Sequence, residues 1–401
     1  MSNSLATSSL ITKEALRILT NMVTFAKNVN REASDEFGTN NGGKYASGAT
    51  INIRKPPRFT IRTGATASAQ AVTEPTVPIT LSQAGVDLAF TSAEMTYSLT
   101  QLQPKLTAAM ATIANKIDFD GLDNARLTVG NLVGTAGTPP STIGAITAVN
   151  QKLDELGAPR DGQRSLVVGP SANAGLIGGL AGYFNSATKL SDQYNKGMLV
   201  DSLGLNIAMD QNVPTHTNGT QAATGVTVNG ASQTGSTINV NTASVTGTIT
   251  KGSVITFAGV FAVNPQSRTS TGALQQFVVT ADVAASATSI SISPALTPTG
   301  AFQNVTASPA NTAAVTIVGT ASTGYVNNMG FHRDAFSLAV VPMFMPPSGK
   351  GVVAAEQESY EGFSLRMIQF YDGTNDKFIT RFDTLYGWAT PYPELAVKLA
   401  G

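Results

Sequence analysis

The chain has no cysteine, only two histidines and few charged residues. Without cysteine there can be no disulfides, no thiolate metal sites and no cysteine nucleophile. Imidazole metal sites and Ser–His–Asp catalysis would depend on His216 or His332. Neither histidine has a convergent set of metal-ligating or catalytic residue types nearby in sequence. We therefore expect no metal, no cofactor and no enzymatic activity.

Charge is scarce and balanced. Charged residues make up 12% of the 401 residues, about half of the ~25% found in ordinary globular domains. The 25 Lys and Arg equal the 25 Asp and Glu, so the formal net charge is zero. Because phosphate binding draws on an excess of cations, we expect only non-specific contact with DNA. A net charge near zero favours association, so the pattern fits either a neutral surface in a salty compartment or a subunit that packs against its own copies.

The sequence also shows no targeting signal. The first ten residues are polar and carry no secretory signal. No stretch approaches ~18 uncharged apolar residues, the length that a membrane-spanning helix needs. The sequence therefore predicts a protein made in a cytoplasm, with no membrane partner.

Three patterns resemble chemical sites, but a structural interpretation fits each one better. Residues 169–173 (Gly-Pro-Ser-Ala-Asn) lack the second glycine of a nucleophile elbow and favour a strand-to-helix turn. The glycines of 175–182 lack the Lys-Ser/Thr of a phosphate loop and favour a loop or close packing. The carboxylates Asp118, Asp120 and Asp123 do not have calcium-loop spacing, so we expect solvated side chains at a helix end.

Apolar periodicity predicts four helices. They cover residues 11–30, 91–127, 141–156 and 171–181. The second is the longest. A capping box over 91–94 begins it, Pro104 is tolerated in a restarted first turn, and one apolar stripe follows: Leu106, Ala109, Met110, Ile113, Ala114 and Ile117. Ser141 is the expected cap of the third helix, and a buried strand over 165–169 gives this part α/β character.

The composition changes abruptly near Val213. From there to Gly330 the only charged residues are Lys251, Arg268 and Asp282. Short alternating runs separated by turns predict an antiparallel barrel or sandwich of roughly six strands, at 225–228, 236–240, 254–257, 276–280, 289–293 and 314–318. We therefore expect an inserted all-β domain over 213–322. Strands are expected again at 335–341, 362–370 and 377–386, and His332 is expected to begin a strand.

A basic segment lies near the N-terminus. Residues 50–62 alternate apolar and polar side chains around a Pro-Pro break, which indicates an exposed strand pair or long β-loop. Between Glu36 and Glu74 every charge is positive, including Arg54, Lys55, Arg58 and Arg62. Such an arm could contact acidic groups of a neighbouring subunit or nucleic acid, and a solvated edge protected by its charges fits the pattern equally well.

Several segments together resemble the major capsid proteins of tailed bacteriophages with the Hong Kong phage fold, in particular the short-tailed-phage coat-protein branch. The segments that carry the resemblance are Ile-Arg-Lys-Pro-Pro-Arg-Phe (53–59), 251–260, Gly-Phe-Ser-Leu-Arg (362–366) with Tyr371-Asp372, 379–388 and Pro-Glu-Leu-Ala-Val (393–397). The resemblance implies an α+β fold with peripheral and axial domains, a long spine helix, an extended β-loop and an inserted antiparallel β-barrel domain.

The resemblance also implies a division of the chain. It comprises an N-terminal arm (1–43), an extended loop (44–80), a peripheral domain with the spine helix (81–140), an axial domain in two parts (141–212 and 323–350), the insertion (213–322) and C-terminal peripheral strands (351–401). The implied function is self-assembly, through hexamers and pentamers, into an icosahedral shell around the phage genome. Scaffolding and portal proteins are the implied partners, and assembly would take place in the host cytoplasm.

The basic segment then acquires a role. We expect Arg54, Lys55, Arg58 and Arg62 to dock on carboxylates of a neighbouring subunit, with the candidates Glu356, Glu358 and Glu361. Covalent cross-linking through Lys and Asn occurs in some members of the wider fold, but no matching positions are found here, so a non-covalent shell is expected. Two alternatives stay open at this point: a tail-associated or surface β-rich adhesin, and a hydrolase with a carbohydrate-binding insert.

Overall fold

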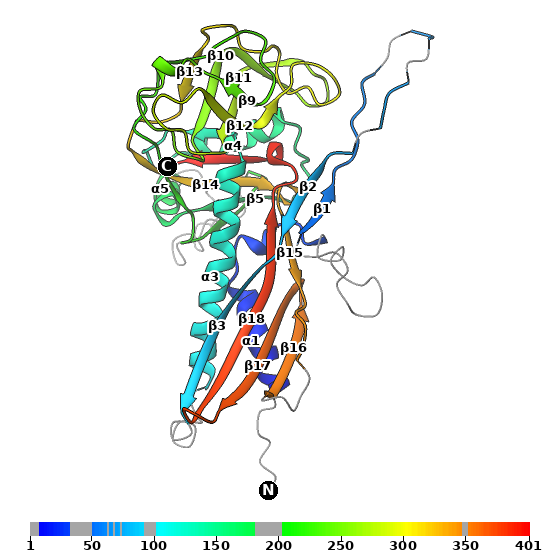
Figure 1. The fold of residues 1–401 in the computed structure, drawn as a ribbon, viewed down its shortest axis with the longest axis vertical. Coiled ribbons are helices and arrows are strands. Elements are labelled where there is room, and N and C mark those ends of the chain that lie inside the picture. The colour runs from blue at the N-terminus through cyan, green and yellow to red at the C-terminus, as the bar shows by residue number, and fades with distance from the viewer. Residues whose placement is uncertain are drawn as a thin grey trace. The chain divides into compact units, whose positions relative to one another are not determined.

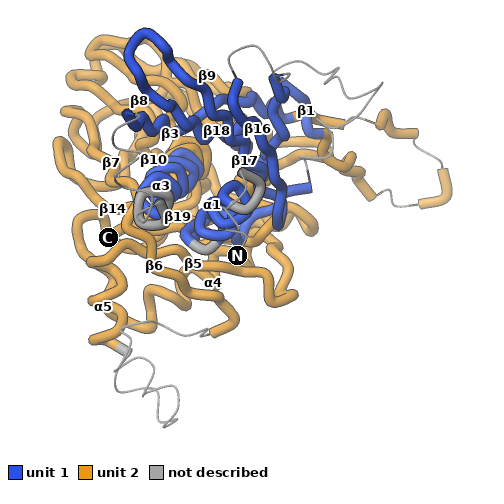
Figure 2. The backbone as a smooth tube through the Cα atoms, turned by 90° about the horizontal axis from the view of Figure 1, so that it is seen from below, with its two compact units in different colours: residues 1–53, 77–121, 337–389 blue, residues 54–76, 122–336, 390–401 orange. Residues whose placement is uncertain are grey.

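The computed structural model describes residues 8–32, 50–61, 64–66, 69–72, 74–91, 102–180, 203–346 and 352–401. The chain divides into two compact units (Figure 2). Unit 1 comprises residues 1–53, 77–121 and 337–389, and unit 2 comprises 54–76, 122–336 and 390–401. Each unit is assembled from segments that are distant in sequence. This division into two units does not test the finer domain boundaries that the resemblance implies, so those boundaries stay predictions.

Unit 1 is built on one long antiparallel sheet. Its strands are β15 (Ser337–Val341), β16 (Val352–Tyr360), β17 (Phe363–Asp372) and β18 (Lys377–Ala389), in the order β15-β18-β17-β16, and β3 (Ser82–Thr91) pairs with β18. Helix α1 (Ser8–Met22) lies against β16 and β17 (Figure 1) and is followed by the short helix η1 (Ala26–Asn28). A separate two-stranded sheet joins β1 (Thr50–Arg54) and β2 (Thr76–Thr80).

Helix α3 (Leu102–Thr128) is the longest helix in the described part of the chain. Pro104 lies in its first turn, where no intrahelical hydrogen bond is lost. The predicted stripe is confirmed where side chains are described, since Ala109, Met110, Ile113, Ala114 and Ile117 are all buried. The predicted helix start at Thr91 was wrong, because Thr91 is the last residue of strand β3. The rest of the expected capping box, residues 92–94, and the side chain of Leu106 lie outside the described residues.

The three aspartates of α3 are not all solvated, so that prediction was wrong for the first of them. Asp118 is buried and its carboxylate accepts the backbone N–H groups of Thr24, Phe25 and Ala26, at 2.6, 3.3 and 2.8 Å. Asp120 accepts the hydroxyl of Tyr386 at 2.7 Å, and Asp123 pairs with Arg126 at 2.6 Å. Asp118 therefore ties the start of η1 to α3.

Unit 2 contains a mixed six-stranded sheet. Its order is β4 (Leu132–Gly134), β19 (Ala396–Ala400), β14 (Gly324–His332), β5 (Arg164–Val168) and β6 (Asn206–Met209), with β7 (Thr215–Thr217) pairing β14. Side chains of α4 (Ile143–Glu155) and α5 (Pro170–Leu180) share one core with β5 and β19. The expected helix over 171–181 and the expected strand over 165–169 are confirmed. The predicted cap at Ser141 was wrong, because α4 begins after Thr142, which makes no capping hydrogen bond.

The charge-poor segment of unit 2 forms a second six-stranded sheet, all antiparallel and curled (Figure 1). The order is β8-β13-β10-β11-β12-β9, with bounds Val226–Thr227, Ala314–Ile317, Val254–Val263, Ser270–Val279, Ser289–Leu296 and Gly235–Asn239. All six predicted runs are strands. Their inward side chains form one core in which Phe257 and Phe277 meet edge to face, with ring centroids 5.5 Å apart.

Two further predictions about unit 2 concern His332 and the glycines near 175–182. His332 ends strand β14 instead of beginning a strand. Of the glycines near 175–182, close packing is confirmed for Gly175 and Gly179, whereas a Cβ at Gly178 would meet nothing within 4 Å. A Cβ at Gly175 would lie 2.6 Å from the carbonyl oxygen of Pro140, and one at Gly179 would lie 1.6 Å from that of Ser141. Helix α5 approaches the backbone at 140–141 so closely that no side chain fits between them.

Candidate assembly surface

The basic loop, defined here as residues 54–76, belongs to unit 2 and carries the predicted cations. Arg54 is 80% exposed and its guanidinium lies 3.9 Å from the carboxylate of Glu74, a loose pair. Arg62 lies outside the described residues. The remaining two cations, Lys55 and Arg58, contact groups of their own chain, so the four residues are not equally available to another molecule.

The two sides of the basic loop are tied together by hydrogen bonds. Lys55 donates its backbone N–H to the carbonyl oxygen of Pro75 at 2.8 Å. The Gln70 side chain accepts from the N–H and hydroxyl of Thr60, at 2.8 and 2.9 Å, and donates to the Thr60 carbonyl at 2.6 Å. These bonds hold apolar side chains in water: Phe59, Ile61 and Val72 are 52%, 92% and 67% exposed. Exposed apolar groups next to cations are typical of a surface that another protein covers.

Contacts at the base of the basic loop come from segments far away in sequence. Arg58 forms an ion pair with Glu394 at 2.7 Å, and its guanidinium lies 5.8 Å from the ring centroid of Phe302. The Lys55 ammonium lies 5.3 Å from the ring centroid of Tyr392. Burial, the main cause, together with the nearby Arg58 lowers the pKa of Lys55.

Sequence reasoning missed these partners. Glu394 and Phe302 follow Arg58 by more than two hundred residues, and no periodicity links positions that far apart. The only signal was Glu394 itself, which lies within the segment 393–397 that carries part of the family resemblance.

The three candidate glutamates lie in unit 1, on β16 and the turn that follows it. Glu358 pairs with Lys13 at 3.6 Å. Arg31 donates to the backbone carbonyl of Glu361, and Glu356 is partly buried within the strand. The predicted meeting of the loop cations with these glutamates stays a prediction.

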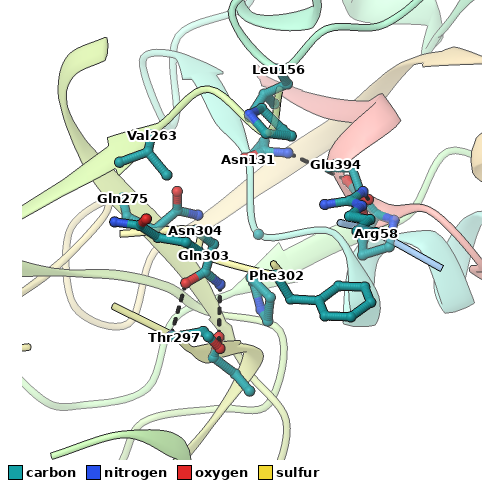
Figure 3. Close-up of a pocket in the computed structure, with 15 residues that line it drawn as sticks. Arg58, Asn131, Leu156, Val263, Gln275, Thr297, Phe302, Gln303, Asn304 and Glu394 are labelled. Carbon is teal, nitrogen blue, oxygen red and sulfur yellow. Dashed lines mark hydrogen bonds and ion pairs between the residues drawn. The ribbon is translucent and has the colours of Figure 1, made fainter. Parts of the chain in front are cut away.

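A cavity of about 250 Å³ lies between helix η6 (Pro393–Leu395) and the curled sheet (Figure 3). Arg58 and Glu394 point toward one another at one side of it, and the Asn304 side chain accepts the N–H of Thr297 at 2.9 Å on the other. Among the described lining residues, only Arg58 and Glu394 are charged, and they neutralise each other. The cavity offers no free general acid, base or nucleophile.

The buried His216 superficially resembles half of a catalytic dyad, because its Nε2 lies 3.1 Å from the Ser253 hydroxyl. Its Nδ1, however, lies 3.0 Å from the Arg126 guanidinium, where a catalytic histidine requires a carboxylate. Burial, followed by the charges of Lys398 and Arg126, lowers the pKa of His216 to about 4. Ser253 is fully buried. With a pKa this low, the His216 imidazole is a poor proton acceptor at neutral pH. A substrate also cannot reach the buried Ser253 hydroxyl.

Metal-binding clusters and membrane-spanning helices can be assessed for the described ranges. No group of three or more histidine and acidic side chains is placed to hold a metal ion there. None of the helices found there is long and apolar enough to cross a membrane.

Comparison with known proteins gives one decisive match. The model of the family described as "P22 coat protein - gene protein 5" matches residues 3–401, nearly the whole chain. No curated protein matches. Solved structures that are similar to this chain include Mycobacterium phage Che8 (13% identity, 94% of this chain and 90% of that chain, TM-score 0.49) and the mature capsid of bacteriophage PhiM1 (11%, 90% and 89%, 0.42). The capsid of Ralstonia phage GP4 is similar at 8% identity (95% and 89%, 0.43). These TM-scores lie below 0.5, so the family match carries the assignment.

The family match identifies the chain as a shell-forming structural protein. The chain belongs to the P22 coat protein family. It is a major capsid protein of a tailed phage, it has the mixed α+β fold of phage capsid proteins, and it assembles with copies of itself into the icosahedral shell of the virion. The family is structural and not enzymatic, which removes the hydrolase and adhesin alternatives.

Proposed function

We propose that the basic loop docks on a neighbouring subunit and so joins the copies of this chain within hexamers and pentamers. The observation that carries the proposal is the loop's exposed surface, on which Phe59, Ile61 and Val72 stand beside Arg54. A monomer gains nothing from holding large apolar side chains in water, whereas an interface buries them at about 25 cal/mol per Å².

The proposed acceptors are the carboxylates of Glu356, Glu358 and Glu361 on the neighbour, and the proposed donors are Arg54, Lys55, Arg58 and Arg62. Arg54 and Glu361 are the most suitable to test, because both are exposed and neither carboxylate nor guanidinium is held in a tight ion pair. An exposed pair contributes only ~0–1 kcal/mol. Each subunit repeats the pair around a closed shell, so a small term per contact becomes decisive for assembly.

A double charge reversal tests this contact. Arg54→Glu is expected to lower the yield of closed shells, and Glu361→Arg in the same chain is expected to restore it. Lys27→Glu, which reverses an exposed cation outside the basic loop, is the matched control and should leave the yield unchanged. If the double variant assembles no better than Arg54→Glu alone, these two residues do not pair between subunits.

The curled sheet is the second part of the proposal. We infer that residues 213–322 form an inserted antiparallel β-barrel domain that supports subunit folding and contacts between capsomers. Its own core and its six strands support this, since such a unit can fold around its own apolar interior. The segment has few charges, so its contacts would rely on Thr, Ser and Asn side chains more than on salt bridges.

The proposed domain plan follows the resemblance. Residues 1–43 are the arm, 44–80 the extended loop, 81–140 and 351–401 the peripheral domain, and 141–212 with 323–350 the axial domain. We further propose scaffolding and portal proteins as assembly partners, and only non-specific contact with the packaged DNA, since the chain has no excess of cations.

A further inference from the structure

The base of the basic loop contacts two separate parts of unit 2. The first part is the segment around η6, where Glu394 pairs with Arg58 at 2.7 Å and Tyr392 lies under the Lys55 ammonium. A cation is attracted both by the face of an aromatic ring and by a carboxylate. Lys55 and Arg58 are both partly buried here.

The second part is the curled sheet itself. Arg268, in the turn between β10 and β11, donates from its Nη2 to the backbone carbonyl of Phe59 at 2.7 Å. Phe302, in the connection between β12 and β13, lies 5.8 Å from the Arg58 guanidinium. In Figure 3 Phe302 and Glu394 flank the Arg58 side chain. Two loops of the charge-poor sheet therefore contact adjacent residues of the basic loop.

On the side of the curled sheet, the described contacts of the loop base are few. Arg58 and Glu394 line both the 250 Å³ cavity and a second cavity of about 410 Å³, which Phe59 and Arg268 also line. Between the two cavities, the contacts of the loop base with η6 and the curled sheet are polar and cation–ring contacts and not a packed apolar core. Arg268 is one of only three charged residues between 213 and 330, and its guanidinium is used here.

We propose that Arg58 is a positioning residue that, through Glu394, Phe302 and Arg268, sets the direction in which the basic loop leaves its own subunit. The charge-poor sheet thereby controls the geometry of the loop before any neighbour is present. This inference rests on the proposed docking of the loop, but it assigns Arg58 to an intrachain contact, whereas Arg54 remains a donor to the neighbour.

Hydrogen exchange on the unassembled chain tests the positioning role. Arg58→Ala and Phe302→Ala are expected to speed the exchange of the Lys55 and Thr60 amides, both hydrogen-bonded within the loop, by about tenfold. Arg58→Lys should give a smaller increase because it keeps the charge but loses the planar stacking. Phe261→Ala, which truncates a half-exposed phenylalanine on β10, should have no effect. Amides of the curled sheet, such as that of Val278, should be unchanged, which excludes general unfolding.

A subunit-mixing experiment tests whether the ion pair lies within one chain. Arg58→Glu and Glu394→Arg are each expected to lower shell yield, and the double variant in one chain should restore it. An equal mixture of the two single variants should not recover, because every chain still carries two like charges at the loop base. Recovery in the mixture would overturn the proposal, since it requires a pair between subunits, and unchanged exchange in Arg58→Ala would overturn it as well.

The two measurements also separate this inference from the docking proposal. Faster loop exchange in Arg58→Ala with normal shell yield in Arg58→Glu would support the positioning role and contradict the docking of the loop.

Discussion

Replacing Asp118 with alanine should destabilise unit 1 strongly. The buried carboxylate accepts three backbone N–H groups at the start of η1, two at short distances (2.6 and 2.8 Å) and one longer (3.3 Å). Hydrogen bonds to a charged group contribute about 1.5–3 kcal/mol each, and their loss leaves buried N–H donors unpaired. Counting the two short bonds at the low end gives a loss of about 3 kcal/mol in the free energy of unfolding.

The chain's single tryptophan provides the assay. Trp388 stacks on Phe25 with ring centroids 5.3 Å apart, and its indole N–H donates to the carbonyl of Ile117 at 3.2 Å, next to Asp118. Its fluorescence during urea unfolding of the unassembled chain therefore reports on this part of unit 1. With a slope of about 2 kcal/mol per M urea, the expected loss shifts the midpoint down by about 1.5 M.

The matched control is Asp87→Ala on β3, where the carboxylate is 65% exposed and lies 3.9 Å from Arg381. A surface change of this kind should alter the free energy of unfolding by less than about 0.5 kcal/mol. If Asp118→Ala shifts the midpoint no more than Asp87→Ala does, the carboxylate is not the anchor of η1.

Two further predictions concern unit 2. Burial lowers the pKa of Lys398 to about 7, against 10.5 for the exposed group, so the unfolded chain binds more protons between these pH values and stability should rise with pH over that window. Urea midpoints at pH 7 and pH 9.5 measure this rise, and Lys398→Met should make it smaller. Gly179→Ala should destabilise unit 2, because the new Cβ would lie 1.6 Å from a backbone oxygen, whereas Gly178→Ala meets nothing within 4 Å and should be neutral or stabilise α5 by up to about 1 kcal/mol. Circular dichroism on heating compares the two glycine variants.

Each of these expectations has a contradicting result. A midpoint that falls between pH 7 and pH 9.5, or a rise that survives unchanged in Lys398→Met, would show that the pH dependence does not come from this lysine. Equal melting temperatures for the two glycine variants would mean that α5 can move away from residues 140–141 at no cost.

Local periodicity predicted much of the fold. The apolar stripe of α3 and the six runs of the charge-poor segment each follow the spacing of their own element, and each is found as predicted. Strand β14 was missed because its sequence includes two adjacent asparagines and two glycines, which favour turns. The structure compensates through distant partners: Asn328 accepts the N–H of Gly169 and donates to the carbonyl of Leu399.

The candidate surface could be predicted only in part. The run of cations in the basic loop is visible in the sequence, but the partners of Arg58 are not, since Glu394 and Phe302 reach it only after the chain has folded. The same holds for Asp118, whose burial depends on a segment about ninety positions earlier. Long-range polar contacts of this kind follow no short repeat, so sequence spacing cannot reveal them.

Electron microscopy of the purified chain, after size exclusion at moderate salt, tests the central claim most directly. A major capsid protein should appear as closed shells, or as hexamers and pentamers that close when a scaffolding protein or a crowding agent is added. Open tubes or filaments, or a monomer that persists at high concentration, would contradict the account.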